Sequence, residues 1–202
     1  TFMRHGVFDN KKIIERIAKR LSDEKLIKKA RVFPYQLLIA SLNTDQQIPG
    51  LISQALMDAL ETSTQNVPIS DKPTVILVDV SGSMSSPITS RHGSKQVSSV
   101  RCVDVASLFA ATWLRKNPNT RIIPFDLKVF SDFRPERGAS ITETVASLSR
   151  FGGGGTAVGT ALQYLNTNFV GAENVIIVSD SESWAGAPLS REWQQYKRRV
   201  PE

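Results

Sequence analysis

Oxygen-bearing side chains that follow two apolar segments are the clearest candidates for chemistry in this sequence. The first segment, 74–79, ends in an aspartate and continues as Val-Ser-Gly-Ser-Met, and the second, 174–179, is followed directly by another aspartate. A glycine run at 152–155 leads to a threonine at the start of a predicted helix. In open α/β sheets ligands bind at the carboxyl ends of strands, so we expect these side chains to converge at one rim. The five candidates are Asp79, Ser81, Ser83, Thr156 and Asp180.

The donor set consists of two carboxylates and three hydroxyls, without histidine or cysteine. Such an all-oxygen set suits a hard divalent cation. Mg²⁺ prefers near-octahedral oxygen ligands and keeps several waters, so one or two carboxylates with neutral hydroxyls are adequate. The pattern therefore predicts a site for Mg²⁺ or a similar cation. An unfilled coordination position could accept an acidic group from a protein partner.

The elements that must position these residues alternate between strands and helices after residue 73. This alternation predicts right-handed crossovers and a mostly parallel, doubly wound α/β sheet. Pro124 places its strand near a sheet edge or a bulge. The strands are expected at 74–79, 121–126, 128–131 and 174–179, and the helices at about 98–116, 140–149, 157–167 and 189–199.

The preceding residues have a different organisation. Four helices are expected, starting near Lys11, Asp23, Pro34 and Pro49, which resembles the end of a helical-repeat array. Residues 62–73 are rich in Ser, Thr, Asn and Pro, as is typical of a linker. We therefore predict two domains, a helical segment at 1–68 and an α/β domain at 69–202.

The positive charge is concentrated at the N-terminal end. The chain carries 25 basic and 19 acidic residues, and residues 1–31 hold ten of the basic and four of the acidic ones, so they account for the whole net charge of +6. Such a segment attracts polyanions such as RNA, although a solvated helix face would have the same composition. The residues expected to contact phosphates are Lys12, Arg16, Lys19, Arg20, Lys25, Lys28 and Lys29.

The Asp-x-Ser-x-Ser, Thr and Asp arrangement resembles the metal-ion-dependent adhesion site of von Willebrand factor A (vWA) domains. Further motifs are similar to the Ro autoantigen, or TROVE-domain, family, including bacterial members. These motifs are Met3-Arg-His-Gly-Val-Phe8, Val32-Phe-Pro-Tyr35, Ser179-Asp-Ser-Glu-Ser-Trp184 and Glu192-Trp-Gln-Gln-Tyr-Lys-Arg198. Asp79, Ser81, Ser83, Thr156 and Asp180 match the family's metal positions, whereas residue 181 is Ser where many relatives have Asn.

The resemblance implies a ring of HEAT-like helical repeats closed by a vWA domain. It also implies binding of small noncoding Y RNAs and of single-stranded ends of misfolded RNAs, and in bacteria a link to exoribonucleases. It further implies a fragment, with most of the ring before Thr1 and the final vWA strands after Glu202. We then expect the strand at 174–179 to have an unpaired edge.

Other functions fit the sequence less well. The glycine run lacks the Gly-Lys-Ser/Thr of a phosphate loop, and no Gly-x-Ser-x-Gly nucleophile motif surrounds Ser81 or Ser83, so we do not expect an enzyme. The single cysteine, Cys102, fits a reducing, cytoplasmic compartment, and no apolar run is long enough for a membrane span. The main alternative is a metal-dependent protein-interaction module. For Trp184, a core position and a partner contact remain equally open.

Overall fold

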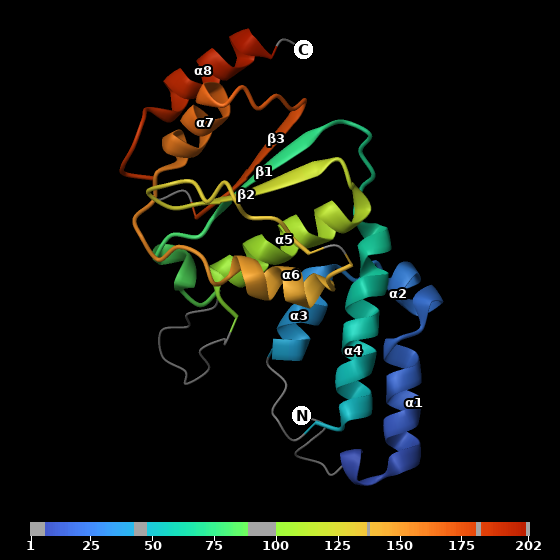
Figure 1. Cartoon of the computed structure of the whole chain (residues 1–202). Coiled ribbons are helices and arrows are strands. Elements are labelled where there is room, and N and C mark those ends of the chain that lie inside the picture. The colour runs from blue at the N-terminus through green and yellow to red at the C-terminus, as the bar shows by residue number, and fades with distance from the viewer. Residues whose placement is uncertain (1–6, 43–47, 89–99, 137, 181–182, 201–202) are drawn as a thin grey trace. The chain divides into compact units, whose positions relative to one another are not determined.

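The computed structural model describes residues 7–42, 48–88, 100–136, 138–180 and 183–200. The chain divides into two compact units, residues 1–68 and 69–202 (Figure 1). We describe each unit by itself. No helix in these described ranges is both long and apolar enough to cross a membrane.

The first unit is helical and centres on its last helix, α4. Ile52, Ala55 and Leu56 of α4 form a core with Ala18 of α1, and apolar side chains of α1 and α3 pack around it. The sequence pattern is amphipathic, but Ile13 and Leu51, at the margins of the apolar arcs, stay exposed. The helices are α1 (Lys11–Leu21), α2 (Glu24–Ala30), α3 (Pro34–Leu42) and α4 (Gly50–Ser63), with 3-10 turns at Val7–Asp9 and Thr64–Asn66.

The second unit is built on a three-stranded parallel sheet in the order β2-β1-β3. This is the α/β architecture predicted from the alternation of strands and helices, and Pro124 lies on β2, an edge strand of the described sheet, as its missing N–H requires. The strands are β1 (Thr74–Asp79), β2 (Thr120–Phe125) and β3 (Asn174–Val178), and the helices are α5 (Cys102–Lys116), α6 (Ile141–Leu148), α7 (Val158–Thr167) and α8 (Leu189–Arg199).

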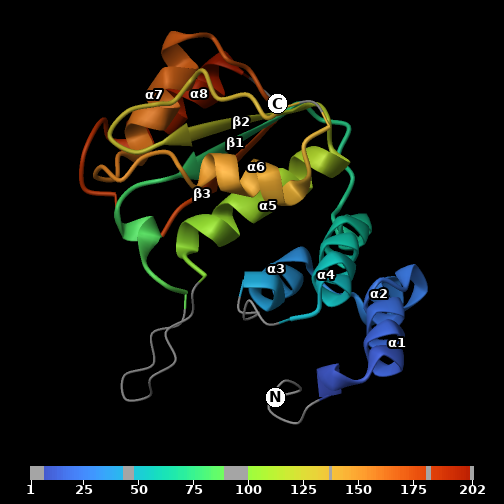
Figure 2. The ribbon, with the colours of Figure 1, turned by 60° about the horizontal axis from the view of Figure 1, so that its bottom comes forward.

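The two faces of the sheet are covered by different helices (Figures 1 and 2). Alternate side chains of a strand point to opposite faces. Val75 and Leu77 of β1 accordingly pack with α7 and with Tyr196 of α8, whereas Ile76 and Val78 pack with α5 and with Leu148 of α6. Helices on both faces explain why the central strand is an uninterrupted apolar run.

Two expectations differ from the structure. Residues 128–131 do not form a strand, because Val129 makes only an isolated antiparallel bridge to Phe125. The strand at 174–179 was expected to be buried, but Ile177 of β3 is exposed and its neighbours are half-buried. The physical reason is that β3 is an edge of the described sheet, so it has a neighbouring strand on one side only.

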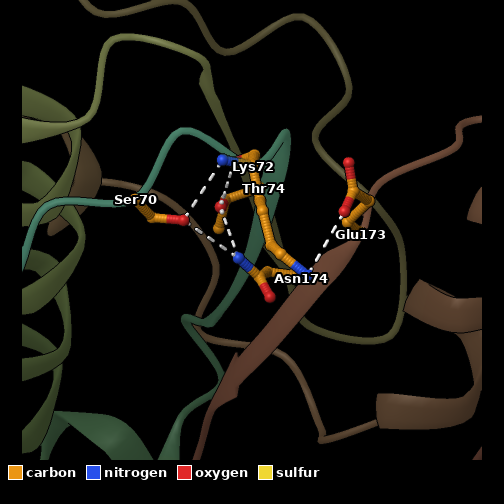
Figure 3. A network of polar contacts seen from close by, with 5 residues as sticks. All are labelled: Ser70, Lys72, Thr74, Glu173 and Asn174. Atoms are coloured by element: carbon orange, nitrogen blue, oxygen red, sulfur yellow. Dashed lines mark hydrogen bonds and ion pairs between the residues drawn. The ribbon is translucent and has the colours of Figure 1, made fainter. Parts of the chain in front are cut away.

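A polar network ties the start of β1 to the start of β3 (Figure 3). The amide of Asn174 donates hydrogen bonds to the hydroxyls of Ser70 and Thr74, at 3.3 and 3.4 Å. Lys72 forms an ion pair with Glu173 at 3.3 Å. These contacts join the amino ends of β1 and β3, where Thr74 and Asn174 are partners in the strand register. The register sets which residues emerge together at the carboxyl ends.

Candidate metal centre

Asp79 is the last residue of β1 and is completely buried. Its Oδ1 accepts a hydrogen bond from the backbone N–H of Ser81 at 2.9 Å, and its Oδ2 accepts one from the hydroxyl of Ser179 at 2.5 Å. These bonds hold the carboxylate at the rim of the sheet, between the turn after β1 and the residue after β3.

Three hydroxyls gather beside this carboxylate. The Oγ atoms of Ser81 and Ser83 are 3.2 Å apart, and the hydroxyl of Thr156 donates to Ser81 Oγ at 2.9 Å. Ser81 and Thr156 are both almost fully buried, although 75 residues separate them. The structure thus connects four of the predicted residues by hydrogen bonds. The fifth, Asp180, follows β3, the neighbour of β1, and is exposed.

The glycine run brings Thr156 to this rim by backbone contact. Gly153 donates its N–H to the carbonyl of Val80 at 2.9 Å, and Gly82 donates to the carbonyl of Gly154 at 2.7 Å. Gly152 has φ of 81°, and a Cβ built on it would lie 1.9 Å from the Val80 carbonyl oxygen. Gly152 and Gly153 thus supply positive φ, and the run as a whole allows close approach of its backbone to the β1 turn. Only glycine fits at residue 152.

Asp126 is a rim residue that the sequence reasoning missed. It follows β2, is buried, and accepts hydrogen bonds from the N–H groups of Lys128 at 2.9 Å and Gly154 at 3.3 Å. It therefore anchors the same glycine run from the other side. Its signal was present, because it comes at the end of a strand as Asp79 does, but the sequence analysis placed it only as the last residue of the expected strand at 121–126.

The donor set fits a hard divalent cation. Burying a carboxylate is costly unless it is paired or binds a metal. Asp79 and Asp126 are both buried, and within the described part of the chain neither forms an ion pair with a lysine or arginine. Asp79, Ser81, Ser83 and Thr156 supply oxygen atoms only, which are the ligands that Mg²⁺ takes in proteins.

A separate buried acid is neutralised by a neighbouring base at the start of α5. Asp104 accepts two hydrogen bonds from the Arg101 guanidinium, at 2.7 and 3.1 Å, and one from the Arg101 backbone N–H. Burial alone pushes the pKa of Asp104 up, but these bonds, with one from Ser149, outweigh it and hold the pKa below its usual range. Asp79 has no such basic partner in the described ranges, so the two acids differ in what balances their charge.

Trp184 lies beside the rim and is not a core residue. Its side chain is 74% exposed, and its ring is so close to Gly155 that a Cβ there would lie 2.4 Å from it. Leu127, which is half exposed, also lies close to this position, with its Cδ2 3.2 Å from the built Cβ. The flanking residues are fixed to the rim, because Ser183 accepts from the N–H of Val158 and Ala185 donates to the carbonyl of Thr156.

Comparison with known proteins identifies this unit. The profile of the family described as the Ro60 vWA domain matches residues 74–200, more than half of the chain. The chain belongs to the Ro60 vWA domain family. The matched residues include the β1 turn, the glycine run and Asp180, so the resemblance seen in the sequence motifs is confirmed.

Two relatives extend the likeness of this Ro60 vWA family member beyond the vWA domain. The RNA-binding protein RO60 of Caenorhabditis elegans is 25% identical over 191 residues, which are 90% of this chain and 28% of that protein. The crystal structure of the Deinococcus radiodurans RO (RSR) protein superposes with a TM-score of 0.71 at 18% identity, covering 96% of this chain and 40% of that one. The chain thus spans less than half the length of either relative.

The seven basic residues predicted to contact RNA belong to the helical unit. Four belong to α1 and three to α2, and all are exposed. The structure records no ion pair between any of them and a described acidic residue. Those in the last turns, Lys19, Arg20, Lys28 and Lys29, also complement the helix dipoles, so part of their effect is structural.

Proposed function

We propose that this chain is part of an RNA-binding protein of the Ro type. In this proposal the basic surface of α1 and α2 contacts RNA phosphates, and the vWA unit carries a Mg²⁺ centre. The observation that carries the proposal is family membership combined with a set of exposed cations on two consecutive helices, none of which pairs with an acid among the described residues. One relative bears the name RNA-binding protein, which supports RNA as the ligand.

The basic surface is defined as Lys12, Arg16, Lys19, Arg20, Lys25, Lys28 and Lys29. Side chains at this surface can neutralise phosphates and release condensed counterions, which supplies affinity that depends on salt. Phosphate contacts of this kind orient a nucleic acid but do not read its bases. The surface itself selects no particular RNA, and we propose structured noncoding RNA of the Y type and single-stranded ends of misfolded RNA because the resemblance to the Ro family implies them. An exoribonuclease is the partner that would act on such ends, in the cytoplasm.

The Mg²⁺ centre is formed by Asp79, Ser81, Ser83 and Thr156, together with Asp180. A bound cation would neutralise the buried carboxylate of Asp79 and offer a Lewis-acidic coordination position. The chain's own residues orient this set: Ser179 and the Ser81 N–H fix Asp79, and Asp126 holds the glycine run in place. We propose a structural or ligand-binding role rather than catalysis, because the rim hydroxyls contact one another and not a general base.

The RNA proposal is tested by reversing two charges in α1. Filter binding of the 202-residue chain to a labelled single-stranded RNA, at several salt concentrations, compares the unaltered protein with Arg16→Glu/Lys19→Glu. We expect weaker binding by the variant and a shallower salt dependence, because each lost phosphate contact removes about 0.7 from the slope for single strands. Two lost contacts thus reduce the slope by about 1.4.

A control with the same change in net charge is Lys116→Glu/Arg150→Glu, in the vWA unit. If the basic surface is the binding site, this control leaves the slope almost unchanged. Equal losses in both double variants would show that only net charge matters, and unchanged binding by the α1 variant would remove the basic surface from the proposal.

A second candidate function is a metal-dependent protein-interaction module. The observation that favours it is the exposed Trp184, fixed beside the rim together with Leu127. An acidic side chain of a partner could complete the cation's coordination while an apolar side chain packs on the indole. Pull-down experiments with and without chelator, and with and without ribonuclease, separate the two functions. Loss of partners with ribonuclease alone supports RNA, and loss with chelator alone supports the protein-interaction module.

A further inference from the structure

Phe169 occupies a backbone position that normally favours glycine. It follows α7 and its C-cap, Asn168, and has φ of 54°. The N–H of Val170 donates to the carbonyl of Leu165 at 3.0 Å, and the N–H of Phe169 donates to Asn166 at 3.4 Å, which together form a Schellman motif. A bulky residue in this left-handed conformation costs roughly 1–2 kcal/mol relative to a relaxed backbone.

Burial does not offset this cost. The side chain of Phe169 is 79% exposed, the largest exposed fraction among the exposed large apolar side chains of the described residues. A phenylalanine whose role was to stabilise the fold would bury its ring. A strained residue that stays exposed instead suggests a functional constraint.

The Phe169 ring makes a cation–π contact with Arg199. The guanidinium of Arg199 lies 5.9 Å from the centre of the Phe169 ring and 5.1 Å from that of Tyr196. Tyr196 in turn stacks on Trp193, with ring centres 5.7 Å apart and planes inclined by 9°. Arg199 also donates hydrogen bonds to the carbonyls of Leu165 and Val170, so the guanidinium is fixed and holds the loop that carries Phe169.

The C-terminal end of α8 is positively charged. Lys197 and Arg198, in the last turn of α8 next to Arg199, are exposed. The acid on this helix, Glu192, is buried and accepts a hydrogen bond from Asn166 at 2.9 Å, so its charge faces inward. Exposed aromatic faces combined with lysine and arginine are the combination by which proteins bind single-stranded nucleic acid, through base stacking and phosphate attraction.

We infer that Phe169 is a stacking platform for an unpaired base of single-stranded RNA, with the guanidinium of Arg199 held beside the ring and the basic end of α8 adding a general attraction for phosphates. This platform shares its ligand with the proposed function but lies in the vWA unit, away from α1 and α2 in the sequence. Stacking is indifferent to base identity, so the platform holds a strand without selecting a sequence.

Phe169→Gly separates this role from a structural one, because the two predict opposite stability changes. The test measures binding of a labelled 12-nucleotide uridine oligomer by fluorescence anisotropy, and the melting temperature, on the 202-residue chain. We expect about tenfold weaker binding, which corresponds to 1.4 kcal/mol, within the range for one stacked base. We also expect a melting temperature equal to or above that of the unaltered chain, since glycine relieves the left-handed strain. Phe169→Asn serves as a second variant that tolerates the same backbone.

The control is Ile69→Ala, which removes another apolar side chain of similar exposure and should leave binding unchanged. Unchanged oligomer binding by both Phe169 variants overturns the inference. A lower melting temperature for both overturns it too, since the ring would then stabilise the fold. Binding to anionic lipid vesicles in place of the oligomer would point to a membrane surface instead. Because the α1 variants are measured separately, failure of the basic surface and failure of this platform are distinguishable.

Discussion

The rim of the vWA unit and the basic surface of the helical unit differ in burial and in how their polar side chains are partnered. At the rim, Asp79, Ser81 and Thr156 are buried, and each is fixed by hydrogen bonds to a specific partner. On the basic surface the side chains are exposed and none has a described ionic partner. A buried, hydrogen-bonded site suits one small ligand at one place, whereas an exposed basic surface suits a polyanion in many registers.

The largest expected effect comes from the backbone of the rim. Gly152→Ala would place a methyl group against the Val80 carbonyl and impose a left-handed φ on alanine. We expect a loss of roughly 3 kcal/mol or more in the free energy of unfolding, since both strain and steric overlap contribute. Urea denaturation followed by circular dichroism measures this loss.

Gly153→Ala is the matched control within the same loop. It has φ of 96° but open space around the built Cβ, so it carries the conformational cost without the overlap. We expect a loss of about 1–2 kcal/mol for it. Equal losses in the two variants would show that the close approach to Val80 is unimportant.

The second largest expected effect concerns Asp104, the buried acid that pairs with Arg101 at the start of α5. The lowered pKa of Asp104 means that its ionised form is favoured in the folded state. Its contribution is therefore present above the usual pKa of an aspartate and is lost as the pH falls through the lowered value. Asp104→Asn should cost on the order of 1.5–3 kcal/mol at neutral pH, the range for a hydrogen bond to a charged group. Measured from pH 6 to pH 3, its free energy of unfolding should fall less steeply than that of the unaltered chain.

Asp58→Asn is the control, because Asp58 is exposed in the helical unit. It should leave both the stability and its pH dependence nearly unchanged. A parallel acid transition in the unaltered chain and in Asp104→Asn would contradict the assigned role of the Arg101–Asp104 pair.

The smallest effect concerns the exposed cap of α1 in the helical unit. Asn10 accepts hydrogen bonds from the N–H groups of Lys12 at 3.0 Å and Ile13 at 3.4 Å. Asn10→Ala should lower the free energy of unfolding by about 1 kcal/mol, whereas Asn10→Asp should keep it, since aspartate caps equally well. Thermal denaturation compares the two variants, and equal melting temperatures would show that the cap contributes nothing.

The residues that meet at the rim could be predicted from the sequence, because local patterns locate the ends of buried strands. Burial on both faces makes β1 an unbroken apolar run, and the carboxyl end of such a strand can be located without coordinates. Four consecutive glycines indicate a loop that passes close to another backbone. This loop brings Thr156 within hydrogen-bonding distance of Ser81. The starts of the four N-terminal helices were predicted from caps and prolines, and α1 to α4 begin within one residue of the predicted positions.

Other features depend on tertiary context that no local pattern contains. The expected strand at 128–131 has the right composition but only a bridge as partner. The exposure of Ile177 depends on which strands flank β3, and the roles of Asp126 and Ser179 depend on which loops meet at the rim. The strained, exposed Phe169 is invisible in the sequence because its significance lies in a backbone angle.

Calorimetric titration of Mg²⁺ tests the central claim most directly, namely that the rim of the vWA unit binds a cation. The unaltered 202-residue chain should bind one equivalent, Asp79→Asn should show no saturable heat, and Asp58→Asn should behave as the unaltered chain does. Circular dichroism confirms that each variant is folded. Equal Mg²⁺ uptake by Asp79→Asn and the unaltered chain, with both folded, would contradict the metal centre.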